Sequence, residues 1–106
     1  MAWIALLLAG LLETDWALLM KKSAGLTLPL PTFLALIAMA ASVWLLSQAM
    51  RSLPLGAAYS VWTGIGAAGA FVTGILLLGE AASPPRFLAA AMILAGVVIL
   101  AVTEPG

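Results

Sequence analysis

A carboxylate near the middle of a long apolar run constrains this chain more than any other feature. Residues 1–20 read MAWIALLLAGLLETDWALLM, with Glu13 well inside the run. An acidic side chain at mid-bilayer depth costs about 2.5–3.5 kcal/mol, so a function is the default interpretation. In a helix, residues three and four apart share a face, which gives one stripe of Gly10, Glu13, Trp16 and Ala17. A carboxyl, an indole and two small residues suit a small cation site; the alternative is a carboxyl that only hydrogen-bonds a neighbouring helix.

The composition indicates a membrane protein. The chain has 106 residues, of which 65% are hydrophobic and 8% charged. A soluble domain this small cannot bury so much apolar surface. Four basic and four acidic side chains balance to zero, which gives no reason to expect a nucleic-acid partner. Without cysteine or histidine the usual disulfide and zinc chemistry is excluded, and we expect no metal and no cofactor. The sequence shows no nucleophile–base set and no phosphate loop, so we expect no enzymatic activity.

Four apolar segments predict an all-α membrane protein that forms a single domain over residues 1–106. Each segment is near the roughly 20 residues that a helix needs to cross the hydrocarbon core. The short connectors require neighbouring helices to run antiparallel, so we expect an up-down-up-down bundle. All six prolines are expected to lie in connectors or the tail, where a missing N–H does least harm. The predicted helices cover roughly residues 2–20, 32–50, 55–79 and 86–103.

The few charges give only a weak prediction of membrane orientation. Lys21, Lys22 and Arg86 fall on one side of the predicted bundle, and Arg51 and the amino terminus on the other. The positive-inside rule weakly favours the first and third connectors in the cytoplasm. With so small a bias, insertion in both orientations stays open.

The third apolar segment carries a second group of candidate site residues. Tyr59, Trp62 and Gly66 share one helix face. Aromatic faces attract cations by about 2 kcal/mol when desolvated, so these residues could wall a cation site; the alternative is an interfacial aromatic belt. Gly64 and Gly66 could form a hinge, or they could be notches that allow close helix packing.

The second and fourth segments offer fewer candidates. Ser42 lies at mid-depth of its segment, where its hydroxyl could orient Glu13 or simply bond a helix backbone. In the fourth segment Ala89 and Gly96 are seven residues apart and share a face with Met92. Small residues at this spacing let membrane helices approach closely, so we expect this face to make a dimer contact.

Three stretches together are similar to a known family. The sequences GLLETDWALLMK, SLPLGAAYSVWTGIGA and GILLLGEAASPPR resemble the small multidrug resistance family, and most of all its guanidinium-exporter subtype, over essentially the whole chain. The resemblance implies an antiparallel, dual-topology homodimer in the bacterial inner membrane that exchanges a cation for protons. It implies that Glu13 is the carboxylate that binds both the proton and the substrate. It further implies that Trp16, Ser42, Tyr59 and Trp62 line the pocket. Gly64 and Gly66 would form the hinge, and Gly96 would make a dimer contact.

Guanidinium suits such a site. It is planar and weakly hydrated, and its N–H groups match a carboxylate bidentately. Protons and the cation would compete for the same oxygens of Glu13, so binding at one common site would couple their movements. Two alternatives remain: a multidrug exporter of quaternary ammonium ions with the same fold, and one subunit of an obligate heteromeric pair.

Thr14 and Asp15 depart from the guanidinium-exporter pattern, in which these two positions are usually apolar. Asp15 lies roughly 200° around the helix from Glu13, so we expect it outside the pocket. It could reach the membrane interface or pair with Lys22 one heptad later. Otherwise it is a costly misfit, or it marks a chain that assembles with a different partner.

Overall fold

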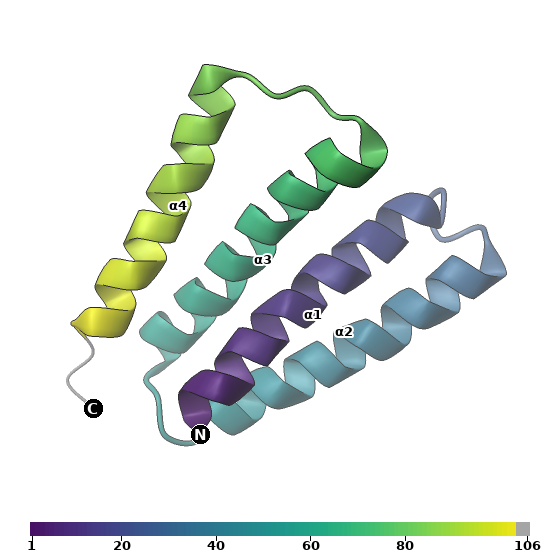
Figure 1. Cartoon of the computed structure of the whole chain (residues 1–106). Helices are drawn as coiled ribbons and strands as arrows, with labels where there is room; N and C mark the ends of the chain where they lie inside the picture. The colour runs from purple at the N-terminus through teal and green to yellow at the C-terminus, as the bar shows by residue number, and fades with distance from the viewer. Residues whose placement is uncertain (104–106) are drawn as a thin grey trace.

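The protein consists of four long helices, all of which could cross a membrane. The computed structural model describes residues 1–103, and these residues contain no strand. Each helix is long and apolar enough to span a bilayer, which confirms the predicted all-α membrane fold. The helices are α1 (Ala2–Lys22), α2 (Pro29–Ala49), α3 (Leu55–Leu78) and α4 (Pro84–Val102) (Figure 1).

The prolines correct the predicted helix boundaries. Helix α2 begins at Pro29 and α4 at Pro84, rather than at residues 32 and 86. Pro31 and Pro85 also lie within these first turns. The expectation that they belong to connectors is wrong, because the first turn of a helix has no partner for its N–H groups and tolerates proline well.

The four helices form a flattened layer whose Cα atoms span 43 × 34 × 16 Å. Helix α1 packs against both α2 and α3, whereas α4 packs only against α3 among the described helices. The order across the layer is therefore α2, α1, α3, α4 (Figure 1). Consecutive helices run in opposite directions, as the short connectors predict.

The core lies where the start of α1 meets the end of α2 and the start of α3. Leu6, Ala9, Ala58 and Val61 are almost completely inaccessible there, and Trp62 closes the cluster at 9% exposure. Most other large apolar side chains are exposed, as expected for helices that face lipid or another protein chain.

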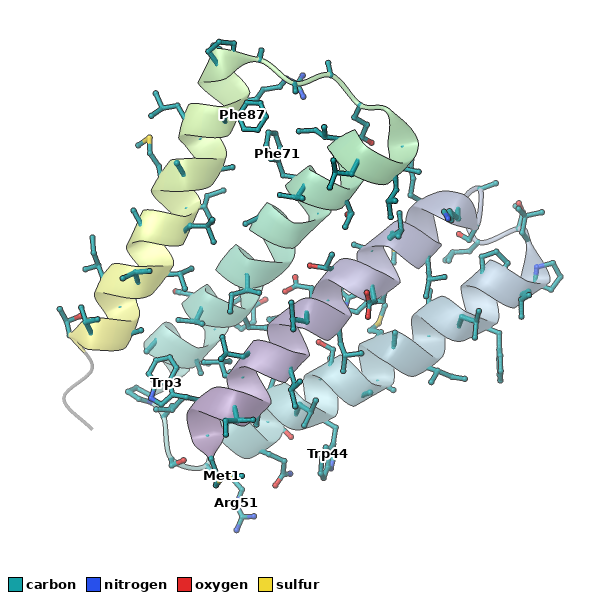
Figure 2. The ribbon with its side chains drawn as sticks, in the orientation of Figure 1. Met1, Trp3, Trp44, Arg51, Phe71 and Phe87 are labelled. Atoms are coloured by element: carbon teal, nitrogen blue, oxygen red, sulfur yellow. The ribbon has the colours of Figure 1, made fainter. Side chains whose placement is uncertain are left out.

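The charges at the helix ends follow the predicted arrangement. Met1 and Arg51 lie at the same end of the layer (Figure 2). Lys21 and Lys22 end α1, and Arg86 lies in the first turn of α4, at the opposite end. The membrane orientation of these two ends stays a prediction.

Candidate functional site

Glu13 lies in the middle of α1 with its side chain against α3. A methyl group added at Gly66 would overlap the Glu13 carboxyl group, so the absence of a side chain at Gly66 makes room for the acid. The Oε2 atom of Glu13 is buried and has no hydrogen-bond partner among the described residues. Because buried polar groups are almost always partnered in native proteins, this oxygen is available to a ligand.

Trp16, which follows Glu13 by about one turn of α1, carries a second unpartnered polar atom. Its indole Nε1 is also buried and without a hydrogen-bond acceptor in the described part of the chain. Residues three apart on a helix share a face, so α1 presents an unused acceptor and an unused donor on the same side. This pair supports the predicted stripe of Glu13 and Trp16.

Ser42 joins three helices but does not bond to Glu13. Its side chain is completely buried; the hydroxyl donates to the carbonyl oxygen of Ala9 at 2.6 Å and accepts from the indole Nε1 of Trp62 at 2.9 Å. Of the two roles considered for Ser42, the structure shows the bond to a helix backbone, at Ala9, and not a bond to Glu13. The hydroxyl proton of Ser42 is donated to the backbone of α1, and the hydroxyl oxygen holds the indole ring of Trp62 in place.

Tyr59 and Trp62 form an aromatic pair on α3. Their ring centroids are 5.3 Å apart with an interplanar angle of 62°, an edge-to-face geometry that aromatic pairs favour. Trp62 belongs to the core, whereas Tyr59 is 50% exposed. The buried position of Trp62 argues against a lipid-facing interfacial belt at this residue, and the exposed Tyr59 ring leaves a face that could contact a cation.

The glycines near the site are packing notches in this structure. A side chain at Gly64 would overlap Val97 of α4, and one at Gly10 would meet Ile65 of α3. Gly10 was expected to leave space for a cation, but Ile65 fills that space. Helix α3 is continuous through Gly64 and Gly66, so their role as a hinge stays a prediction.

Thr14 packs against α3 next to Glu13, a role that the sequence did not predict. Its hydroxyl donates to the carbonyl oxygen of Gly66 at 3.3 Å, and its side chain fills the notch at Gly69. At 7% exposure it is one of three buried polar side chains among the described residues. The sequence signal was the spacing of Gly66 and Gly69, which places two notches on one face of α3, but nothing in the pattern identified Thr14 as their occupant.

Asp15 lies away from Glu13, as expected from its angle around α1. It is exposed and lines a groove together with Leu11, Val72 and Leu94. The structure thus separates two carboxylates that are only two residues apart in the sequence.

The two predicted dimer-contact residues both have free space around them. Ala89 is exposed, and a side-chain carbon built at Gly96 meets no atom within 4 Å. Trp44, by contrast, points outward from α2, away from the site (Figure 2). The contact at Ala89 and Gly96 stays a prediction, because it concerns a second chain.

Comparison with known proteins agrees with this architecture. Residues 1–94 match the family described as Small Multidrug Resistance protein. A guanidinium exporter of Citrobacter freundii is 55% identical over 98 residues, which cover 92% of this chain and 93% of the relative. A guanidinium exporter of Yersinia pseudotuberculosis is 56% identical over 98 residues, 92% of this chain and 94% of the relative. The four spans and these relatives indicate a multi-pass protein of the bacterial inner membrane. The chain belongs to the small multidrug resistance family.

Proposed function

We propose that this protein exports guanidinium or small guanidinyl cations in exchange for protons, with Glu13 as the binding group for both. The observation that carries the proposal is the buried, unpartnered Oε2 of Glu13 in a membrane-spanning helix. The names of relatives at 55% and 56% identity support the choice of guanidinium as the exported cation.

The chemistry of the site fits a planar cation with several N–H donors. Guanidinium can donate two parallel hydrogen bonds to one carboxylate, and Glu13 has an oxygen free to accept. The aromatic pair of Tyr59 and Trp62 supplies ring faces that favour a cation. Because the Ser42 hydroxyl holds the indole N–H of Trp62, this ring keeps a fixed orientation.

Exchange follows from competition for one group. A proton on Glu13 removes the negative charge that the cation needs, so the two ligands exclude each other. If the protein changes its access only when loaded, the downhill flow of protons drives export. This chain shows no internal repeat, so the inverted symmetry that such transport commonly uses would come from a second, antiparallel copy.

Reconstituted vesicles test this proposal directly. With wild-type protein, a guanidinium gradient should move protons across the membrane. Glu13→Gln keeps the shape of the side chain but cannot exchange a proton, so it should abolish the coupled flux. Asp15→Asn is the matched control, because it removes an acid from the opposite face of α1 and should retain the flux. Coupled transport that survives in Glu13→Gln would move the chemistry to Asp15 or to another group.

A multidrug exporter of the same fold is the second candidate. The half-exposed ring of Tyr59 could contact a quaternary ammonium ion, which lacks N–H donors and would depend on aromatic faces. A panel of cations separates the two: proton movement with tetraalkylammonium but not with guanidinium would overturn the guanidinium assignment. Transport only after co-expression with a related chain would instead support the obligate heteromer.

A further inference from the structure

Glu80, which follows the end of α3, packs against a glycine of α3 in the same way as Glu13 does. A methyl group built on Gly74 of α3 would lie 3.0 Å from Cδ of Glu80 and still closer to one of its carboxyl oxygens. Gly66 and Gly74 therefore each make room for a carboxyl group. Eight residues of helix separate the two glycines, which corresponds to about 12 Å along α3 and places both near the same face.

The backbone turns Glu80 back toward the helix. Gly79 ends α3 in the left-handed conformation, with φ of 67°, a conformation that glycine adopts without strain. The N–H of Glu80 then donates to the carbonyl oxygen of Gly74 at 3.0 Å. The carboxyl group is thereby held beside α3 rather than extended away from it.

Glu80 lines a cavity of about 190 Å³ between α1 and α3. Its inner residues are Ala17 and Ala70, each one helical turn beyond Glu13 and Gly66 respectively. Thr73 adds a hydroxyl, and Lys21 lines the same cavity as Glu80. The cavity thus begins one turn beyond the Glu13 site and extends to the C-terminal ends of α1 and α3, where we expect the membrane to meet water.

We propose that Glu80 is an access site that collects the cation on its way to or from Glu13, and that the ammonium group of Lys21 competes with the cation there. This inference rests on the proposed function and adds to it a second carboxylate and a competing charge. Among the described residues, Glu80 is the one carboxylate outside the membrane-spanning helices.

Close to Glu80, two sources of negative charge favour a cation, although Lys21, Lys22 and Arg86 place positive charges at the same end of the layer. The C-terminal end of a helix carries a partial negative charge from its unpaired carbonyl groups, and at the end of α3 this adds to the charge of Glu80. Charged groups that line a narrow mouth raise the local concentration of the oppositely charged ligand. Lys21 faces the same cavity, so the positive charge it carries lowers the attraction for cargo. Lys22 and Arg86, also at this end, do not line it.

Four variants in vesicles test the proposal, and two of them should change KM in opposite directions. At low ionic strength Glu80→Gln should raise the apparent KM for guanidinium about three- to tenfold, at or below the lower limit of electrostatic steering because a single charge is lost, while Vmax changes little. Lys21→Gln should lower KM, because it removes the competing cation. Lys22→Gln is the matched control and should leave KM close to wild type. Glu80→Asp keeps the charge and should stay closer to wild type than Glu80→Gln.

The ionic strength identifies the cause of any change. Raising salt to about 0.5 M should bring all variants to a similar KM, because the attraction is screened; a loss caused by misfolding would persist. Thermal stability in detergent checks each variant for folding, and Lys21→Gln tests the idea even if Glu80→Gln is unstable. Wild-type protein that moves no guanidinium would refute the proposed function. Normal wild-type transport with an unchanged KM in both Glu80→Gln and Lys21→Gln would refute this inference alone.

Discussion

Helices α1, α2 and α3 differ from α4 in how much surface they bury within one chain. The first three contain every buried residue that lies in a helix, including the buried polar side chains of Thr14 and Ser42. Helix α4 has no buried residue and packs against α3 alone among the described helices. Its contacts include Val97 in the notch at Gly64 and the edge-to-face pair of Phe71 and Phe87, 5.6 Å apart (Figure 2).

This difference separates the helices that carry the candidate site residues from the helix that leaves an apolar face exposed. The candidate site residues Glu13, Trp16 and Trp62 all belong to the three packed helices. There the notch at Gly66 holds the Glu13 carboxyl group, and the Ser42 hydroxyl holds the indole of Trp62. Helix α4 contributes none of them and leaves an apolar surface uncovered, with Ile99 and Val102 strongly exposed. The packing that surrounds these candidate residues therefore comes from α1, α2 and α3, whereas α4 leaves a face open to lipid or to another chain.

The largest effect is expected when the notch that holds the site is filled. Gly66→Ala would place a methyl group where the Glu13 carboxyl lies, and the acid would have to move. A displacement of about 1 Å at a reacting group can lower activity about 100-fold, so we expect a 10- to 100-fold loss of guanidinium-driven proton flux. Gly56→Ala is the control, because its added carbon meets nothing within 4 Å. Equal activity in the two variants would show that Glu13 does not depend on this contact.

A smaller loss is expected from the hydroxyl that links the packed helices. Ser42→Ala removes the donor to Ala9 and leaves the buried N–H of Trp62 without a partner. We expect the free energy of unfolding to fall by about 1–2 kcal/mol, measured by denaturation in detergent. Ser47→Ala is the control, since that hydroxyl bonds only its own helix at Trp44. A loss no greater than that of Ser47→Ala would mean that Ser42 does not hold the three helices together.

The sequence predicted the elements well because lipid imposes simple requirements. Hydrophobic length defines each span, since every backbone group must bond within its own helix. Glu13 was identifiable for a related reason: an acid in such a segment is costly without a role. Helix ends were less accurate, because Pro29 and Pro84 read as breaks in the chain although they serve as helix starts.

The pairing of side chains across helices could not be read from periodicity. The pattern places Ser42 and Glu13 at similar depth, but the rotation of α2 about its axis decides whether the hydroxyl meets a carboxyl or a carbonyl. In this structure it meets the carbonyl of Ala9. The same limit explains why Gly10 was assigned to the cation site, although Ile65 occupies its notch. Helix faces follow from spacing; their partners depend on three-dimensional packing.

The smallest effect concerns α4 and tests whether its uncovered face meets a second chain. A methyl group added by Gly96→Ala meets no atom of its own chain within 4 Å, so the stability of a single chain should not change. If Gly96 packs closely against a partner helix, the added methyl should weaken association by about 1 kcal/mol, or roughly fivefold. The measurement is the concentration dependence of energy transfer between labelled chains in detergent micelles. Gly64→Ala gives the opposite pattern, because its methyl would overlap Val97 within the chain and should lower folding stability instead. If Gly96→Ala leaves association unchanged, the contact lies elsewhere and the free face of α4 is covered by lipid.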